Sequence, residues 1–332
     1  PAALRPQAPG RPQTAEAIIR DLLLLAVLCS IAPMVLRAPW IGLLAWIWIA
    51  LMNPNREVHG FLYGAPLNMF IAALTGLAWA FSRERKALPA NAFPLLLLAF
   101  LGWATISTIF ALDRPQALPI WSRTAKTVIL ALAVMMLATT RVRLQATIWM
   151  IVVSLGFYGV KGGGFTLLGG GRDHVFGPEA SMIEDNNSLG LALVVILPLL
   201  NYLRLTSARP LVRAALLAIM ALTLLAILGT YSRGALIALA AAGVAYALRA
   251  RNGPLLLAAG AVIAFTLPAV MPERWLERMS TIQTAGQDES FQVRLAAWTT
   301  SLDIALARPL IGGGFAAVEQ TWIVKTFSPA GG

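Results

Sequence analysis

The sequence predicts an all-α, multi-pass membrane protein, a helical bundle of about 9–10 spans. Three observations support this class. The chain of 332 residues is 58% hydrophobic and only 12% charged, whereas soluble domains average about 25% charged residues. Its apolar residues gather in long uncharged runs, and its Lys and Arg residues form short clusters between those runs. Membrane proteins orient themselves in this way, so the net charge of +11 does not indicate nucleic-acid binding.

The apolar runs give the predicted spans. A helix needs about 20 residues to cross the hydrocarbon core, with a range of roughly 17–25. Gly and Pro inside the runs do not argue against helices, because both are common in membrane spans. We predict spans near residues 22–36, 39–52, 67–82, 92–110, 125–140, 144–160, 187–203, 214–229, 234–248 and 254–270.

Positive clusters fall at every second loop of this span order. They are "RERK" with Arg83, Arg85 and Lys86, "RVR" at 141–143, "RLTSARPLVR" at 204–213 and "RAR" at 249–251. Because short cytoplasmic loops are enriched in Lys and Arg, we expect all four in the cytoplasm. The opposite side then receives residues 53–66, 111–124, 161–186, 229–234 and everything after Met271.

At the N-terminus the two topology cues disagree. Strict alternation places it outside, whereas Arg5, Arg11 and Arg20 favour the inside. The short segments 22–36 and 39–52 are interpreted either as one long kinked span or as a re-entrant pair. We give more weight to the four later loops.

The predicted organisation has three parts: a polar, Pro-rich tail over 1–19, a transmembrane bundle over 20–270, and the start of a large outer loop over 271–332. The chain begins at Pro1 and ends in "SPAGG", so we expect a processed or incomplete chain with its C-terminal spans missing. A second apolar segment follows the first at once, which argues against a signal peptide. The single Cys29 excludes an internal disulfide and is expected to be a small buried hydrophobe.

The stretch "LGTYSRGALIAL" places Arg233 inside an apolar run over 214–248. As one helix the run would be about 52 Å long, far more than the hydrocarbon thickness of about 30 Å. We therefore predict two short spans joined by the turn "GTYSRG", with Gly229 and Gly234 supplying backbone freedom. Arg233 then begins a helix at the outer membrane edge.

Two interpretations of Arg233 stay open. The first is a snorkelling side chain that reaches lipid phosphates. The second is one half of a phosphate clamp, because a guanidinium binds phosphate through two parallel hydrogen bonds and stays charged. The N-terminus of the helix that Arg233 begins would add to the preference for an anion.

Other outer segments carry candidate substrate-binding residues. Arg123 and Lys126 are three apart and share one helix face at the membrane edge, as a solvated face or as a substrate contact. Lys161 opens a predicted loop whose glycine triplets at 162–164 and 169–171 let backbone approach a ligand. No Gly-Lys-Ser/Thr follows, so this is not a nucleotide loop.

The sequence "EDNN" ends that loop at the head of the next span. It consists of Glu184, Asp185, Asn186 and Asn187. One of these side chains is expected to cap the helix. Capping does not explain all four, so we include them among the candidate substrate-binding residues.

After Met271 the chain becomes polar and amphipathic. Apolar residues at helical spacing predict a helix near 289–307 that is too short in apolar length to span and lies along the outer membrane surface. Arg294 sits beside this apolar stripe, and Pro309 with the glycines at 312–314 ends the helix. The stripe itself consists of Phe291, Leu295, Trp298, Leu302 and Leu306.

Metal and hydrolase chemistry find little support. The only histidines are His59 and His174, and with one cysteine they show no paired ligand spacing. No nucleophile elbow is present. His174 beside Asp173 is either a base or a solvated loop histidine.

Three motifs, taken in order, resemble the O-antigen ligase and polymerase superfamily. They are "TYSRGAL", "DESFQVRLAAW" and "ARPLIGGGF". The stretch "KGGGFTLLGGGRDHVFGPE", followed by "IEDNNSLGLALVVILPLL", is similar to one branch, the O-glycosylation ligases associated with exosortase A systems. The resemblance covers roughly residues 20–332.

This resemblance implies a GT-C-like, metal-independent glycosyltransferase of the bacterial inner membrane that needs no cofactor. Its partners would be an undecaprenyl-diphosphate-linked glycan, membrane lipid and a protein or lipid acceptor on the periplasmic side. Arg233 and Arg294 match the two family arginines that hold the diphosphate, and the histidine taken as the base in the family would follow Gly332. Glu179, Glu184 and Asp185 are the expected resting counter-charges.

The chemistry fits this expectation. A diphosphate is a good leaving group, so fixed arginines in a poorly hydrated site need mainly to neutralise its developing charge. A base then takes a proton from the acceptor hydroxyl. A polymerase that uses the same donor as acceptor stays an alternative, as does a non-catalytic transporter or structural subunit of a membrane complex.

Overall fold

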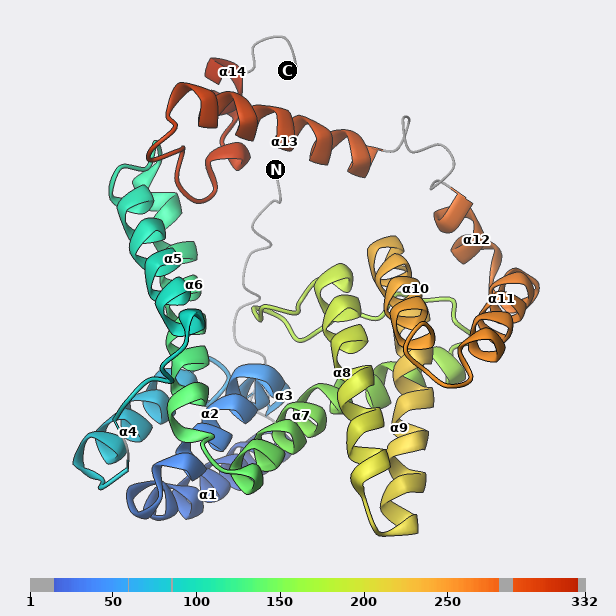
Figure 1. Ribbon diagram of the computed structural model, residues 1–332, viewed down its shortest axis with the longest axis horizontal. Coiled ribbons are helices and arrows are strands. Elements are labelled where there is room, and N and C mark those ends of the chain that lie inside the picture. The colour runs from blue at the N-terminus through green and yellow to red at the C-terminus, as the bar shows by residue number, and fades with distance from the viewer. Residues whose placement is uncertain (1–14, 59, 85, 281–288, 328–332) are drawn as a thin grey trace. The chain divides into compact units, whose positions relative to one another are not determined.

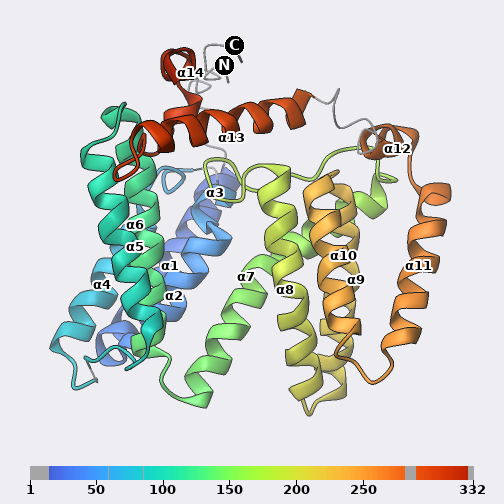
Figure 2. The ribbon, with the colours of Figure 1, turned by 45° about the horizontal axis from the view of Figure 1, so that its top comes forward.

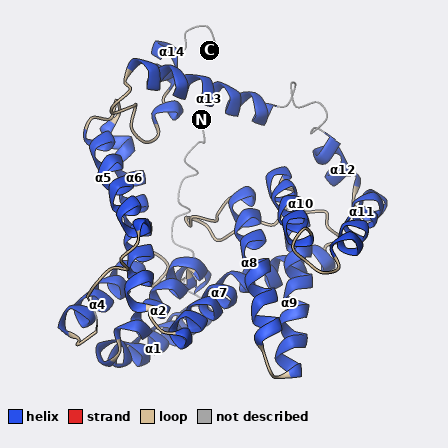
Figure 3. Ribbon diagram, viewed as in Figure 1, coloured by secondary structure: helices blue, strands red, loops and turns tan. Residues whose placement is uncertain are grey.

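A computed structural model describes residues 15–58, 60–84, 86–280 and 289–327, and within them the chain is helical without a β-strand (Figure 1; Figure 3). Six of these helices are long and apolar enough to cross a membrane, and four shorter apolar helices accompany them. The ten correspond in order to the ten predicted segments. The prediction of an all-α multi-pass membrane protein is confirmed.

The long apolar helices are α1 (Ala15–Arg37), α5 (Ala92–Ile109), α6 (Arg114–Leu137), α7 (Arg141–Leu168), α8 (Asn186–Thr206) and α9 (Pro210–Gly229). The shorter ones are α2 (Pro39–Met52), α4 (Leu67–Phe81), α10 (Arg233–Ala247) and α11 (Gly253–Val270). The remaining elements are α3 (Pro54–Val58), α12 (Glu273–Ser280), α13 (Glu289–Ala307), the 3-10 turn η2 (Ala317–Glu319) and α14 (Thr321–Phe327).

The chain forms two compact units. The first unit comprises Pro1–Glu84 and Thr140–Met279, and the second comprises Arg85–Thr139 and Ser280–Gly332. Each unit therefore joins segments that are far apart in the sequence. The tail, bundle and outer-loop boundaries expected from the sequence stay a prediction.

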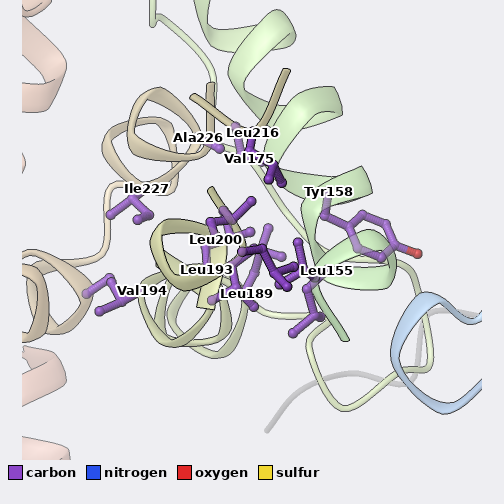
Figure 4. Close-up of a cluster of buried hydrophobic side chains, with 14 residues drawn as sticks. Leu155, Tyr158, Val175, Leu189, Leu193, Val194, Leu200, Leu216, Ala226 and Ile227 are labelled. Atoms are coloured by element: carbon purple, nitrogen blue, oxygen red, sulfur yellow. The ribbon is translucent and has the colours of Figure 1, made fainter. Parts of the chain in front are cut away.

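Helices α7, α8 and α9 form the centre of the first unit. Fourteen buried apolar side chains from these helices and their neighbours pack together there, among them Leu193, Leu200 and Ile227 (Figure 4). Figure 2 shows α8, α9 and α10 side by side, with α12 at the end where α10 begins. Much of the remaining apolar surface, such as Phe265 on α11, is exposed, as expected for helices that face lipid.

Glycines on α7 allow its close contact with α9. A Cβ at Gly159 would overlap the hydroxyl of Thr223, and a Cβ at Gly163 would overlap the carbonyl oxygen of Leu222. Small residues four apart are a common means of bringing membrane helices together. The expectation that residues 161–168 belong to a loop was therefore wrong, because α7 continues through the first glycine triplet to Leu168.

The N-terminal helices α1 and α2 are separate and fold back on each other. Leu24 and Leu28 of α1 share an apolar cluster with Trp48 of α2, which excludes one long kinked span. Near the start of α1, the buried Asp21 accepts a hydrogen bond from the backbone N–H of Leu62, at 3.3 Å. The start of α1 thus lies at the same end of the unit as the segment between α3 and α4, as strict alternation requires.

One expectation for α1 was wrong. Cys29 is exposed, whereas the sequence predicted a buried side chain. Its helix places few residues in the protein interior, with Asp21, Leu24 and Val35 as its buried members. An apolar run in a membrane helix therefore does not distinguish lipid contact from burial in protein.

At the opposite end of the first unit, Arg143 binds Glu84 through two hydrogen bonds of 2.9 and 2.6 Å. These bonds hold the pKa of Glu84 below its usual value. The ion pair joins the "RERK" and "RVR" segments, two of the four loops predicted to be cytoplasmic; Arg85 lies outside the described residues. The membrane side of each end stays a prediction.

The second unit is built on the hairpin of α5 and α6. Its helices are joined by a hydrogen bond from Trp121 Nε1 to Thr105 Oγ1, at 3.0 Å. Helix α6 begins at Arg114, eleven residues before the predicted span, because Asp113 caps it by accepting from the N–H of Gln116. The predicted outer loop over 111–124 is correspondingly shorter.

The C-terminal segment docks on the tip of this hairpin. Ser107 Oγ donates to the carbonyl of Ile311 at 2.7 Å, and the N–H of Leu112 donates to Gly313 at 3.0 Å. Arg308 also donates to the carbonyl of Phe110 at 2.8 Å. The "ARPLIGGGF" segment thus satisfies backbone groups at the end of α5, besides ending α13.

Candidate functional site

The turn between α9 and α10 carries Arg233. Helix α9 ends at Gly229 and α10 begins at Arg233, as predicted. Ser232 caps α10 by accepting a hydrogen bond from the N–H of Ala235 at 3.1 Å. This cap fixes the first residue of the helix, and the Arg233 side chain is half-buried there.

The residue with a left-handed backbone conformation in this turn is not one of the two predicted glycines. Tyr231 has a left-handed conformation, with φ of 56°, whereas Gly229 and Gly234 do not take positive φ values. Gly229 serves packing instead, because a Cβ there would overlap the hydroxyl of Thr166 on α7. The expected role of the two glycines as flexible points was wrong.

Contacts from the loop at 169–185 hold Tyr231 in place. The buried Tyr231 hydroxyl donates to the carbonyl of Gly171 at 2.5 Å. The His174 ring lies against the Tyr231 ring, with 4.2 Å between ring centroids. The N–H of Val175 donates to the carbonyl of Gly229 at 2.8 Å. These contacts supply the support that a non-glycine residue needs in a left-handed conformation.

The "EDNN" side chains build the other wall of the turn. Asn186 Nδ2 donates to the carbonyl of Thr230 at 2.8 Å, and Ser232 Oγ donates to Asn187 Oδ1 at 2.7 Å. Asp185 caps α8 by accepting from the N–H groups of Asn187 and Ser188.

These partners account for the ionisation and placement of the acidic pair. Burial opposes ionisation of Asp185, but the hydrogen bonds from Ser188 and Asn187 keep its pKa below the usual value. Glu184 accepts from the N–H of Ala180 at 2.8 Å. All four "EDNN" residues thus have a structural task, and their contact with substrate stays a prediction.

A cavity of about 320 Å³ lies beside this turn. One of its walls comes from α7, and Lys161 on that wall is paired with Glu57 of α3, with 2.8 Å between Nζ and Oε2. Lys161 is therefore a helix residue in an ion pair, not the start of a loop. The cavity lining consists of Glu57, Tyr158, Lys161, Gly162, Phe165, His174, Val175, Phe176, Gly177 and Pro178.

His174 borders both the cavity and the turn. Burial lowers its pKa, the nearby Arg278 lowers it further, and Asp173 opposes the shift. The imidazole is therefore neutral at neutral pH and has one nitrogen available to accept a hydrogen bond. This is consistent with a base or a ligand contact.

The remaining site candidates belong to the second unit. Arg123 and Lys126 are exposed on α6, ten and thirteen residues into that helix by its bounds, so they lie on a helix as expected, and their contact with substrate stays a prediction. Arg294 is exposed on α13, whose bounds match the predicted helix near 289–307. Arg233 belongs to the first unit, so its convergence with Arg294 stays a prediction.

Sequence reasoning missed the cavity. Residues 158, 161, 162 and 165 share one face of α7 at helical spacing, but the glycine triplet had been assigned to a loop. A prediction of one uninterrupted helix through residue 168 would have revealed this face. No local sequence pattern links Glu57 to the cavity, because its partner Lys161 is 104 positions away.

Groups of His, Cys, Asp and Glu side chains that could hold a metal ion are not found among the described residues. His59 lies outside those residues. At the start of α10, the guanidinium of Arg233 and the positive end of the helix dipole both favour an anion, and the binding of an anion there stays a prediction.

Two family models match the chain. A family of unknown function (DUF5935) covers residues 19–208, more than half of the sequence, and the O-antigen ligase family covers residues 216–330. The first match contains the cavity residues, and the second contains Arg233 and Arg294. Searches among curated proteins and among solved structures find no match. The chain therefore belongs to the DUF5935 family, and its residues 216–330 match the O-antigen ligase family, which supports the resemblance to that superfamily.

Proposed function

We propose that the protein is a glycan ligase that transfers a glycan from an undecaprenyl-diphosphate carrier to an acceptor at the periplasmic face of the bacterial inner membrane. The observation that supports this most is the capped turn that fixes Arg233 at the first position of α10. That turn lies within the part of the chain that matches the O-antigen ligase family. The sequence resemblance points further to the exosortase-associated branch.

In the proposed reaction, the bond between the glycan's anomeric carbon and the diphosphate oxygen breaks. The acceptor oxygen bonds to that carbon, its proton goes to a base, and undecaprenyl diphosphate leaves. Arg233 binds the diphosphate through two parallel hydrogen bonds and neutralises its developing charge. Arg294 contributes the second guanidinium of the proposed clamp.

Acidic groups near the turn suit the resting state of such a site. Two guanidiniums close together repel each other unless an anion lies between them. Asp185 is held in its ionised form at the head of α8. Glu179 accepts a hydrogen bond from the Tyr63 hydroxyl at 3.1 Å, within the same unit as Arg233. We propose that these carboxylates balance the arginine charge before the donor binds.

The direct test measures glycan transfer in membranes that contain the complete enzyme, the carrier-linked donor and the acceptor. We expect Arg233→Lys and Arg294→Lys each to lower transfer about ten- to hundredfold, since a lysine keeps the charge but loses the paired bonds. The matched control is Arg172→Lys, an exposed arginine of the loop at 169–185. Full activity of Arg233→Lys would reduce Arg233 to a snorkelling lipid anchor.

The topology behind this proposal has a separate test. In a Cys29→Ser background, we expect a membrane-impermeant thiol reagent to label Arg172→Cys from outside the cell and to spare Lys86→Cys. Disruption of the membrane should expose Lys86→Cys to the reagent. The reverse labelling pattern would contradict the placement of the Arg233 turn on the periplasmic side.

A further inference from the structure

The cavity beside the Arg233 turn lies wholly within the first unit and has no role in the clamp described above. Helix α3, helix α7 and the loop at 169–185 form its walls. Its volume of about 320 Å³ is at the lower end of the range of about 300–1,000 Å³ for small-molecule sites. A cavity of this size admits a sugar ring but not a polyprenyl chain.

We propose that this cavity is a saccharide subsite that holds one sugar ring of the glycan handled at the Arg233 turn. The proposal rests on the proposed function, because that function makes a glycan the ligand of the neighbouring turn. It adds the part of the substrate that the arginines do not recognise. Four features of the cavity support it.

The first feature is charge. The Nζ of Lys161 lies 2.8 Å from Glu57 Oε2, so the cation and the carboxylate compensate each other. His174 adds no charge at neutral pH, because burial and Arg278 lower its pKa. A phosphate or diphosphate site needs uncompensated cations. The balance here instead suits a neutral ligand that both donates and accepts hydrogen bonds.

The second feature is aromatic surface. Phe165 is 49% exposed and Phe176 is 62% exposed, and both line the cavity. The face of an aromatic ring carries partial negative charge. A pyranose presents C–H groups with partial positive charge on its apolar face and hydroxyls around its edge. Aromatic faces combined with polar groups therefore complement a sugar better than they complement a lipid tail.

The third feature is the set of polar groups around those rings. Lysine and carboxylate side chains supply donors and acceptors in one ion pair, and the neutral His174 supplies a further acceptor. Gly177, which also lines the cavity, serves packing within the loop itself, because a Cβ there would overlap the carbonyl oxygen of Ile183.

The fourth feature is the connection to the turn. His174 lines the cavity and packs on Tyr231, with 4.2 Å between ring centroids. Val175 lines the cavity and donates to the carbonyl of Gly229, at 2.8 Å. Tyr231 and Gly229 belong to the turn that carries Arg233. A ring in the cavity would therefore lie beside the segment that positions the diphosphate.

The two family matches separate the cavity from the turn that carries Arg233. The side chains of the cavity belong to residues 19–208, the family of unknown function, whereas the turn belongs to the O-antigen ligase match. We assign sugar recognition to the first part and diphosphate recognition to the second.

The experiment uses the purified chain in detergent and ligand-observed saturation-transfer NMR. The probes are glucose, galactose, mannose, rhamnose and N-acetylglucosamine, each tested alone. We expect saturation transfer to the ring protons of at least one sugar. Phe176→Ala and Glu57→Gln should reduce that signal at least threefold, and Phe176→Trp should keep it. The matched control is Leu168→Ala, because Leu168 is 90% exposed at the end of α7 and does not line the cavity.

Three results would overturn the proposal. They are no saturation transfer to any of the five sugars, an unchanged signal in both Phe176→Ala and Glu57→Gln, and displacement of the sugar by inorganic diphosphate. The last would make the cavity an anion site. Phe176 is exposed, so its alanine variant should fold normally, which melting temperatures of all variants would establish.

A further variant separates this proposal from the proposed function. Arg233→Lys should keep sugar binding while it loses glycan transfer. If the protein binds sugar at the cavity but transfers no glycan, the proposed function fails and the subsite stands. If Arg233→Lys loses transfer but the wild-type protein gives no sugar signal, the subsite fails and the proposed function stands.

Discussion

The two arginines proposed to hold the diphosphate lie in structurally different surroundings. Arg233 begins a helix whose cap, Ser232, is buried and bonded to Asn187. Arg294 lies in the N-terminal half of α13, among exposed side chains such as Val293 and Leu295. The buried part of α13 comes later, at Thr300 and Ile304.

This difference indicates how the two halves of the proposed clamp work. The position of Arg233 is determined by packing within its own unit, so it can be preorganised before substrate binds. The position of Arg294 depends on a helix that its unit anchors mainly at the other end. The clamp thus combines a fixed cation with one that is carried on a less buried helix, and three predictions test this contrast.

The largest expected effect concerns the packing of α7 against α9, the helix that leads into the Arg233 turn. Gly163→Ala would push a Cβ into the carbonyl of Leu222 on α9, so α7 and α9 must separate. We expect a loss of about 3 kcal/mol in the free energy of unfolding, the upper end of the cost of overpacking, since backbone cannot rotate away. Thermal unfolding in detergent, followed by helical circular dichroism, measures it.

Gly164→Ala is the matched control for that variant. A Cβ at this next position of the same helix would meet no neighbouring side chain or helix within 4 Å, so alanine there should be neutral or stabilise by up to about 1 kcal/mol. Equal melting temperatures of the two alanine variants would show that close contact between α7 and α9 does not support the turn.

The second prediction removes the cap of the fixed arginine. Ser232→Ala deletes the hydroxyl that accepts from Ala235 and donates to Asn187. Loss of a helix N-cap costs about 1–2 kcal/mol, and Arg233 should lose its fixed position, so glycan transfer should fall with stability. Unfolding and transfer assays on the same membranes measure both effects.

Ser301→Ala on α13 gives the comparison for the second helix. Ser301 is exposed, and its hydroxyl donates to the carbonyl of Ala297 within the same helix. A surface change of this kind should stay within about 0.5 kcal/mol. If both serine variants cost the same stability and activity, the contrast between the two arginines is wrong.

The span order and the position of Arg233 were predictable, because both follow from the length of apolar runs. A run over 214–248 cannot be one span, and a turn at its centre places Arg233 at a helix start. Local sequence did not reveal which residue adopts the left-handed conformation. Tyr231 takes that role because contacts from Gly171 and His174, about 60 positions earlier, hold it.

Errors in the prediction arose where glycine has two uses. The triplet at 162–164 was interpreted as a flexible loop, but in a membrane helix a missing side chain also permits close packing, as Gly163 shows against α9. The glycines at 312–314 were assigned to helix termination. Gly314, with φ of +82°, also brings the chain against Ala111 of the α5–α6 hairpin. Both contacts join distant segments, which periodicity does not reveal.

The smallest expected effect is a dependence of stability on pH. His174 belongs to the unit that carries Arg233, and histidine is the side chain whose charge ordinarily changes between about pH 5 and 8. The pKa of folded His174 lies below its ordinary value, because burial and Arg278 disfavour the charged imidazole and outweigh Asp173. As pH falls through about 6.5, the unfolded chain binds a proton before the folded chain does.

The stability that the neutral His174 contributes is therefore complete above pH 6.5 and is lost as pH falls through the folded-state pKa. We expect the melting temperature of the wild-type protein to decline across this window, and His174→Gln to remove part of that decline while its melting temperature at pH 8 stays close to that of the wild type. His59 is present in both proteins, so the difference between their pH curves isolates His174. Parallel curves would mean that the loop at 169–185 does not couple the charge of His174 to the packing of Tyr231, and that the Arg233 turn is held by its hydrogen bonds alone.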